Sequence, residues 1–357
     1  MNKVLVVDDT VFMRQYLKNV IEASFQDVEV IVAASGIIAL EKIKVYEPDV
    51  ITLDFEMPGM NGLDCLREFT KITQVPIIMV SSFTSQGAKI SIDALSFGAF
   101  DFVCKPSKIF NNEPNDFEEH FLEKIEAGLY FTKQHQAIRK KSAFTELFKQ
   151  EKEQQVKPIV EIKKIDYSKI EVIGIGISTG GPSVVREILS RLPKNFKFPI
   201  MIVQHMPVGF TFEFAGRLND VSELEVKEAQ DGDILKKGRV LIAPGGKQLE
   251  VEKSSLAGFV KVFDGEKVSG HKPSADILFS SLAKYYGDKV LGIIMTGMGA
   301  DGSKGLLEMR KAGAVTWAQN EETCVVYGMP KVAVEKGAVC EIMSVDAIIE
   351  KLMQIGI

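Results

Sequence analysis

The sequence lacks the residue patterns that mark zinc-bound, secreted and membrane-spanning proteins. Its four cysteines lie far apart and include no Cys-x-x-Cys pair, which fits a reducing compartment and argues against a zinc site. No apolar run approaches the roughly 18 residues that a membrane-spanning helix needs. Two acids follow the first apolar residues of the chain, so the N-terminus is unlike a signal peptide. We therefore expect a cytoplasmic protein without membrane insertion.

Positive charge is also in short supply over the chain as a whole. The net charge is −5, which argues against binding of nucleic acid. One region differs, because residues 133–169 contain ten Lys or Arg, five Asp or Glu and no glycine. Such a stretch buries little apolar surface and predicts a basic linker that is helical only in part. It could be a solvated tether or a docking site for an acidic partner.

Apolar strands alternate with amphipathic helices on both sides of this linker. The 357 residues suffice for about two domains. Repeated strand–helix units predict doubly wound parallel sheets. We expect two α/β domains, at residues 1–106 and 169–357, joined by a long linker at 107–168. The expected strands are 3–7, 28–33, 50–53, 76–80 and 101–104 before the linker, and 172–177, 200–203, 239–242 and 290–295 after it.

Charged residues follow three strands of the first half. Asp8 and Asp9 follow the first strand, Asp54 the third, and Lys105 the fifth. One such acid is most often a turn or capping residue, but functional groups of open α/β sheets gather beyond the carboxyl ends of the strands. Three converging carboxylates repel one another, so we expect a cation, and an all-oxygen ligand set suits Mg²⁺. With that charge neutralised, one carboxylate could attack a phosphoryl group.

The second half begins with a strand, a glycine-rich turn and a helix start at 172–183. A dinucleotide fingerprint does not fit, because Thr179 stands where its last glycine would be. A P-loop does not fit either, since its lysine is missing. The remaining pattern, Gly-x-Ser-x-Gly at Gly176, Ser178 and Gly180, predicts a nucleophile elbow. In that interpretation the flanking glycines permit a tight, strained turn.

Histidine is scarce, which narrows the choice of a base for this serine. Only His205 and His271 of the four histidines fall in the second half. We favour His205, which ends the next strand, and Asp301 as the acid that orients it. Asp301 lies in a glycine-rich loop whose backbone N–H groups suit an oxyanion hole. The order serine, acid, histidine of α/β-hydrolases would instead select His271 with Asp231 or Asp233, which we rank second.

The first half resembles response-regulator receiver domains over about residues 1–106. The resemblance rests on Val-Asp-Asp, Leu-Asp-Phe-Glu-Met-Pro-Gly-Met-Asn-Gly and Phe-Val-Cys-Lys-Pro at strand ends. It implies a flavodoxin-like fold with Asp54 as the phospho-acceptor. It also implies Mg²⁺ held directly by Asp9, through water by Asp8, and by Asp54 and the backbone carbonyl of Glu56. The implied switch residues are Lys105, which would pair with the phosphate, the hydroxyl of Ser81, with Ser82 adjacent, and the aromatic Phe102.

The second half resembles the chemotaxis protein-glutamate methylesterase domain from about residue 170 to the C-terminus. The shared motifs include Gly-Ile-Ser-Thr-Gly-Gly-Pro, Gln-His-Met-Pro, Ile-Ala-Pro-Gly, His-Lys-Pro-Ser-Ala-Asp-Ile-Leu-Phe and Thr-Gly-Met-Gly-Ala-Asp-Gly. The resemblance implies a Rossmann-like three-layer fold and chemistry without a cofactor. The implied triad is Ser178, His205 and Asp301, with Thr179 and the N–H of Met298 at the oxyanion positions. One departure is Gln248, where the family often has histidine.

Together the two resemblances imply a phosphorylation-regulated serine esterase of chemotaxis adaptation. It would hydrolyse glutamate γ-methyl esters on cytoplasmic helices of methylated chemoreceptors, release methanol, and deamidate receptor glutamines. A chemotaxis histidine kinase would be the phosphodonor, and phosphorylation would relieve an occlusion of the active site. Two other functions stay open at this point: a signalling module whose second half only binds a partner, and a metabolic hydrolase of small esters.

Overall fold

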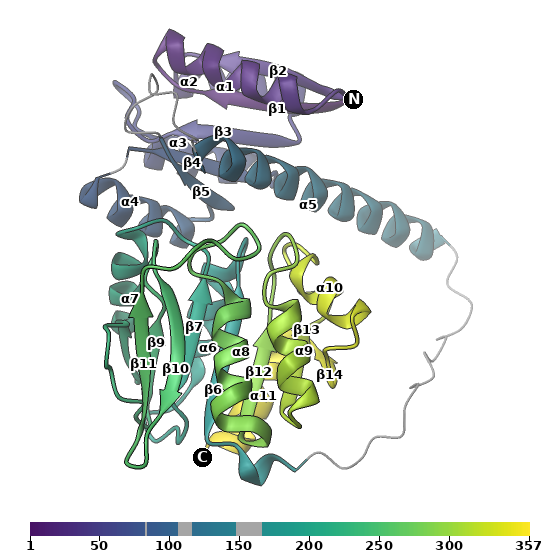
Figure 1. The fold of residues 1–357 in the computed structure, drawn as a ribbon. Coiled ribbons are helices and arrows are strands. Elements are labelled where there is room, and N and C mark those ends of the chain that lie inside the picture. The colour runs from purple at the N-terminus through teal and green to yellow at the C-terminus, as the bar shows by residue number, and fades with distance from the viewer. Residues whose placement is uncertain (83, 106–115, 148–165) are drawn as a thin grey trace.

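Two parallel α/β sheets form the framework of the protein (Figure 1). The computed structural model describes residues 1–82, 84–105, 116–147 and 166–357. The expected fold class, two α/β domains with parallel sheets, is confirmed. About half of the basic run of the predicted linker, at 148–165, lies outside the described residues. None of the helices within the described ranges combines the length and the apolar character that a membrane crossing requires.

The N-terminal sheet has five strands in the order β2-β1-β3-β4-β5, all parallel. Helices α1 and α5 pack on one face, and α2, α3 and α4 pack on the other. The strands are β1 (Asn2–Val7), β2 (Val28–Ala33), β3 (Val50–Asp54), β4 (Ile77–Ser81) and β5 (Asp101–Cys104). The helices are α1 (Val11–Ser24), α2 (Gly36–Tyr46), α3 (Gly62–Ile72), α4 (Ser85–Ser96) and α5 (Asp116–Leu147).

Helix α5 occupies part of the segment that the sequence predicts as linker. Phe117, Phe121, Ile125 and Leu129 lie at every fourth position of α5 and are buried in the core of the N-terminal sheet. Such spacing places one apolar stripe on the sheet. The start of the predicted linker therefore contributes core residues, because the basic and polar composition sets in only beyond this stripe.

The C-terminal sheet has seven parallel strands in the order β14-β13-β12-β6-β7-β9-β8. Helices α8, α9 and α10 cover one face, and α6, α7 and α11 the other. The strands are β6 (Val172–Ile177), β7 (Ile200–Gln204), β8 (Glu225–Glu228), β9 (Arg239–Ile242), β12 (Val290–Ile294), β13 (Val315–Gln319) and β14 (Glu341–Met343). The α-helices are α6 (Gly181–Arg191), α7 (Phe210–Val221), α8 (Ala275–Tyr286), α9 (Ser303–Lys311), α10 (Met329–Glu335) and α11 (Val345–Gly356), with short 3-10 turns η1 (Tyr167–Lys169) and η2 (Gly287–Lys289).

The sequence-based prediction missed part of this second sheet. Strands β8, β13 and β14 extend it at both ends, and β10 (Gln248–Lys253) and β11 (Gly258–Phe263) form a separate antiparallel hairpin. β8 and β14 are short and half-exposed, so they lack the continuous apolar run of a buried parallel strand. β6, β7 and β12 lie side by side at the centre of the sheet.

Candidate active site and acidic cluster

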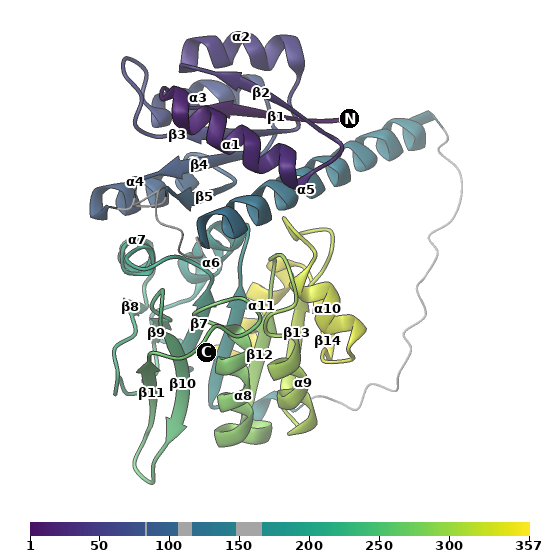
Figure 2. The ribbon, with the colours of Figure 1, turned by 45° about the horizontal axis from the view of Figure 1, so that its top comes forward.

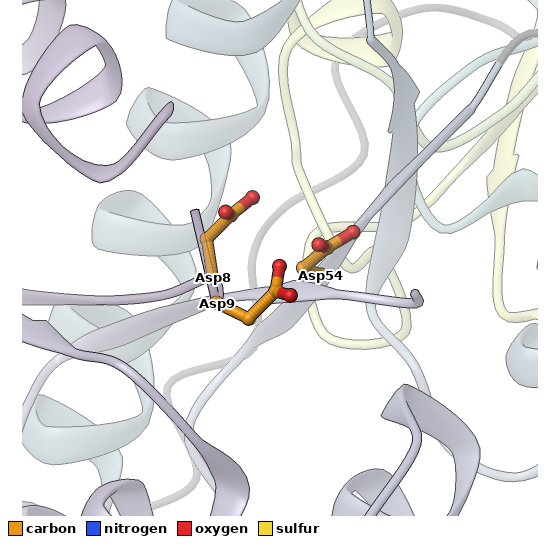
Figure 3. Close-up of side chains that lie close together, drawn as sticks. All are labelled: Asp8, Asp9 and Asp54. Carbon is orange, nitrogen blue, oxygen red and sulfur yellow. The ribbon is translucent and has the colours of Figure 1, made fainter. Parts of the chain in front are cut away.

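Three carboxylates meet at the carboxyl edge of the N-terminal sheet (Figure 3). Val7 of β1 is in register with Leu53 of β3, so Asp8 and Asp54 follow at neighbouring strand ends. Asp9 comes next, and one oxygen from each of the three acids lies within 4.8 Å of the others. Asp8 and Asp54 are buried and Asp9 is exposed. An acidic, all-oxygen cluster of this kind is typical of a Mg²⁺ site.

Lys105 joins this cluster from the end of β5. Its Nζ lies 3.0 Å from Asp8 Oδ2 and 2.8 Å from Asp54 Oδ1. Burial raises the pKa of Asp54 to about 6, although the charge of Lys105 works against that rise. Burial by itself would lower the pKa of Lys105, but the charges of Asp54 and Asp8 outweigh it and raise the pKa. The ammonium therefore stays charged and neutralises part of the acidic cluster.

The other residues predicted for the phosphorylation site divide between this edge and the domain interface. The backbone N–H of Glu56 donates to Asp54 Oδ1 (3.3 Å), so Glu56 belongs to the edge. Ser81 is buried at the end of β4, and its hydroxyl donates to the Gly87 carbonyl (3.4 Å) at the start of α4. The Phe102 ring instead stacks on Phe210 of α7, with ring centroids 4.7 Å apart. Phe102 thus connects the two domains.

Ser178 stands at the carboxyl edge of the C-terminal sheet, directly after β6. It is completely buried, and its backbone is fixed by hydrogen bonds from its N–H to the Thr296 carbonyl (2.9 Å) and from Gln204 Nε2 to its carbonyl (3.0 Å). Its hydroxyl has no hydrogen-bond partner among the described residues. A nucleophilic serine must pass its proton to a base, and the Ser178 hydroxyl is not committed to any other group among these residues.

Only one of the two glycines around this serine serves the purpose that the sequence predicts. The positive φ of the turn, +77°, is at Gly180 and not at Ser178. Gly176 lies inside β6, where a Cβ atom would approach Ala275 Cβ of α8 to 2.7 Å. Gly176 is therefore required by the close packing of α8 on the sheet, whereas Gly180 is required by the turn.

His205 follows β7 and reaches the same edge. Ile177 of β6 is in register with Gln204 of β7, so Ser178 and His205 are the next pair of residues. His205 Nε2 lies 2.8 Å from Asp301 Oδ2. The other ring nitrogen, Nδ1, is buried without a partner among the described residues, as is the Ser178 hydroxyl. The two groups that a serine–histidine pair would use are thus both unengaged.

Asp301 is held by the start of α8. It accepts hydrogen bonds from the Ser274 hydroxyl (2.6 Å) and from the backbone N–H of Ala275 (2.6 Å). Burial would raise the pKa of Asp301, but the hydrogen bond and charge of His205, with those of the helix start, hold it at about 2. The carboxylate is therefore ionised at neutral pH and fixes the His205 ring through Nε2.

His271 stacks flat on His205, with ring centroids 3.8 Å apart and planes 10° from parallel. Burial and then the charge of His205 lower the pKa of His271 to about 3, so it stays neutral. The alternative acids are engaged elsewhere, since Asp231 accepts the Val262 N–H and Asp233 pairs with Lys227. The structure therefore does not assemble the second-ranked triad around His271.

The two residues expected at the oxyanion positions flank Ser178 from different loops. Thr179 directly follows Ser178 in the chain, and its Oγ1 accepts a hydrogen bond from Lys124 Nζ of α5 (2.9 Å). Met298 lies in the loop after β12, and no hydrogen bond of its N–H is found within the described part of the chain. The Thr296 hydroxyl ties the two loops together by donating to the Thr179 carbonyl (2.9 Å) and accepting the Val326 N–H (2.9 Å).

Several residues of this site were missed by sequence reasoning. Buried side-chain hydrogen bonds join Gln204 to the Ser178 carbonyl and Thr296 to the Thr179 carbonyl, and the only signal of these two residues was a polar side chain at the end of an apolar strand. Lys124 was assigned to the linker. Gln248 is completely buried, and it accepts the Ser274 N–H (2.9 Å) and donates to the Glu266 carbonyl (2.8 Å). It thereby braces the loop that leads into α8.

Comparisons with known proteins match both halves of the chain. The family model for the CheB methylesterase matches residues 173–352, and that for the response regulator receiver domain matches residues 4–111. A protein-glutamate methylesterase/protein-glutamine glutaminase of Bacillus subtilis is 43% identical over 98% of this chain and 96% of its own length. One of Treponema denticola is 42% identical over 96% of this chain and 95% of its own. The crystal structure of the Thermotoga maritima CheB methylesterase catalytic domain is similar to 52% of this chain over 98% of its own, with 41% identity and a TM-score of 0.51.

Proposed function

The chain belongs to the CheB methylesterase family, and we propose that Ser178, His205 and Asp301 are its catalytic residues. It is a protein-glutamate methylesterase and protein-glutamine glutaminase that acts in chemotaxis under the control of a receiver domain. The observation that supports the triad is the 2.8 Å contact of His205 Nε2 with Asp301, which leaves Nδ1 and the Ser178 hydroxyl as the two unengaged groups.

In the proposed reaction the Ser178 oxygen attacks the γ-carbonyl carbon of a methylated glutamate, and His205 Nδ1 takes the serine proton. Asp301 stabilises the imidazolium that forms. Thr179 and the Met298 N–H donate to the oxyanion of the tetrahedral intermediate. His205 then protonates the leaving methoxide, and methanol departs. A water, deprotonated by His205, hydrolyses the acyl-enzyme. For a glutamine side chain the leaving group is ammonia, and the intermediates are otherwise equivalent.

This reaction uses the histidine ring in the reverse orientation from the usual serine protease arrangement, in which Asp contacts Nδ1 and serine contacts Nε2. The start of α8 explains the choice. Ser274 and Ala275 hold the Asp301 carboxylate at Nε2 of the ring through hydrogen bonds of 2.6 Å each. His271 restricts rotation of the ring by stacking on it.

In the receiver domain we propose Asp54 as the phospho-acceptor. Asp9 would hold Mg²⁺ directly, Asp8 through water, and Asp54 and the Glu56 carbonyl would complete the protein ligands. The convergence of three carboxylates within 4.8 Å supports this set. When bound, the cation offsets the negative charge of the acidic cluster and of the incoming phosphoryl group.

Three residues respond to the phosphoryl group in this proposal. Lys105, already 2.8 Å from Asp54, pairs with it. Ser81 gives up its contact with the Gly87 carbonyl to donate to it. Phe102 then repacks against Phe210, which links the phosphorylation site to the catalytic domain. We assign the receiver to 1–106 together with the packed part of α5, the linker to the remainder of 107–168, and the methylesterase domain to 169–357.

The proposed partners are methylated chemoreceptors as substrate and a chemotaxis histidine kinase as phosphodonor, which places the protein in the cytoplasm. The test is methanol release from methylated receptor membranes, with and without phosphodonor. We expect S178A to abolish release and S183A, on an exposed serine of α6, to leave it unchanged. An S178A variant that still releases methanol would refute the triad. Turnover of small esters without receptor would favour a metabolic hydrolase instead.

A further inference from the structure

The hairpin of β10 and β11 packs beside α8 (Figures 1 and 2). Its first residue, Gln248, is completely buried although its side chain is polar. Both ends of the amide are engaged. Oε1 accepts the N–H of Ser274 (2.9 Å), and Nε2 donates to the carbonyls of Glu266 (2.8 Å) and His271 (3.4 Å). One buried amide thus ties together three points of the entry loop, residues 266–274, which leads into α8.

Two residues of the entry loop contact the proposed catalytic residues. The Ser274 hydroxyl donates to Asp301 Oδ1 (2.6 Å), and the other oxygen of that carboxylate lies 2.8 Å from His205 Nε2. The His271 ring lies flat on the His205 ring, with centroids 3.8 Å apart. Ser274 therefore acts on the edge of the catalytic ring through the acid, and His271 acts on its face. Gln248 holds the backbone of both residues.

The orientation of the His205 ring decides whether it can act as the base. Half a turn about the bond from Cβ to the ring would exchange Nδ1 with a carbon atom, and no acceptor would then face the serine proton. A ring with a flat neighbour at 3.8 Å cannot make this turn unless His271 moves away. Because burial and the charge of His205 lower the pKa of His271 to about 3, the neighbour is neutral and does not repel the imidazolium.

From these contacts we infer that Gln248 is a positioning residue for catalysis, which acts through Ser274 on Asp301 and through His271 on His205. The inference rests on the proposed function, since it concerns the same acid and base. Loss of the amide should slow the chemical step and leave substrate binding in place. A reacting group that is misplaced by about 1 Å can cost about 100-fold in rate.

The first test compares Q248M with S281A in the full chain, activated by phosphodonor. Both side chains are buried, but Ser281 Oγ bonds to the Val251 N–H of β10 (2.9 Å) and within α8. Each variant leaves a buried N–H without its acceptor, so both should lower Tm. We expect Q248M to lower kcat for methanol release about 10- to 100-fold with KM changed less than about twofold, and S281A to leave kcat within about twofold. Equal kcat values in the two variants would overturn the inference.

The second test addresses the stacked ring. H271A removes the neighbour of the His205 face, whereas H271F keeps a flat, neutral ring without nitrogen atoms. We expect H271A to lower kcat about as much as Q248M does, and H271F to recover most of that loss. An H271F variant as slow as H271A would overturn the part of the inference that runs through the stack.

The third test observes the ring directly, by nitrogen NMR of enzyme with labelled histidine. The chain has only four histidines, and the spectra report which ring nitrogen carries the proton. In the wild type we expect His205 to carry it on Nε2, toward Asp301. Q248M should show a mixture of both tautomers, and S281A should match the wild type. A wild-type His205 protonated on Nδ1 would count against the proposed function. A wild-type tautomer retained in Q248M, with an unchanged kcat, would overturn the inference alone.

Discussion

Replacing the buried Lys124 by methionine should raise the rate of the unphosphorylated enzyme. Lys124 carries a positive charge to the active-site edge, 2.9 Å from Thr179 Oγ1. Methionine keeps an unbranched apolar side chain and removes the charge and the donor. In the closed arrangement, with the receiver on the active-site edge as in this structure, the variant loses a charged hydrogen bond. In an open arrangement, with the receiver moved away and Lys124 in water, it would lose little.

The structure sets the size of this effect. A hydrogen bond to a charged group contributes about 1.5–3 kcal/mol, and 1.4 kcal/mol corresponds to a factor of about ten in an equilibrium. The ratio of open to closed enzyme should therefore rise about 10- to 150-fold in K124M. Basal methanol release should rise by the same factor, up to the rate of the phosphorylated enzyme. Phosphodonor should stimulate the variant correspondingly less.

Two control variants separate this effect from damage to the fold. K124M leaves Asp101, 3.1 Å from the ammonium, buried without its cation, and an unpaired buried charge is destabilising. The double variant K124M/D101N removes both charges and should keep the raised basal rate. Q134A removes the 3.3 Å hydrogen bond to Glu321 further along the same helix and should change the rate less than about twofold. A K124M/D101N rate equal to that of Q134A would refute the reasoning.

Three further predictions concern the phosphorylation site, the triad and the domain interface. Burial raises the pKa of Asp54 to about 6 in the folded state, so the folded protein favours the protonated acid, and the stability this gives is complete below pH 4 and is lost as the pH rises through 6. The neutral side chain of D54N should therefore raise the free energy of unfolding in urea by up to about 3 kcal/mol at pH 7.5, where Asp54 is charged, and by little at pH 4. D301N should lower kcat of the phosphodonor-activated enzyme by about 10⁴ with little change in KM, since the histidine loses the acid that orients it. F210A should raise basal methanol release about two- to tenfold by removing the stack on Phe102, whereas F212A, on an exposed ring of α7, should not.

Strand ends account for most of what the sequence could predict about the two sites. Asp54 ends a buried strand, while Ser178 and His205 directly follow strands of the same kind, and parallel strands bring their carboxyl ends to one edge. Ser178 and His205 follow β6 and β7, which are consecutive along the chain and also adjacent in the sheet. Asp301 is different, because β12 pairs with β6 across more than a hundred residues. No local pattern encodes that pairing, so Asp301 was selected from its glycine-rich loop after an apolar strand, without any signal that this strand lies beside β6.

The composition of the linker concealed the element that joins the two sites. Residues 133–169 are basic and polar, but the helix begins earlier, and its apolar stripe at Phe117, Phe121, Ile125 and Leu129 was a readable signal. Beside this stripe the helix carries Lys124, whose partners Thr179 and Asp101 are distant in sequence or in another element and therefore unreadable. One helix thus packs its apolar stripe on the phosphorylated domain and presents its charged residues to the esterase. Any shift of the receiver core must move the apolar stripe and the charged residues of α5 together, which is the physical requirement for a phosphorylation signal to reach Ser178.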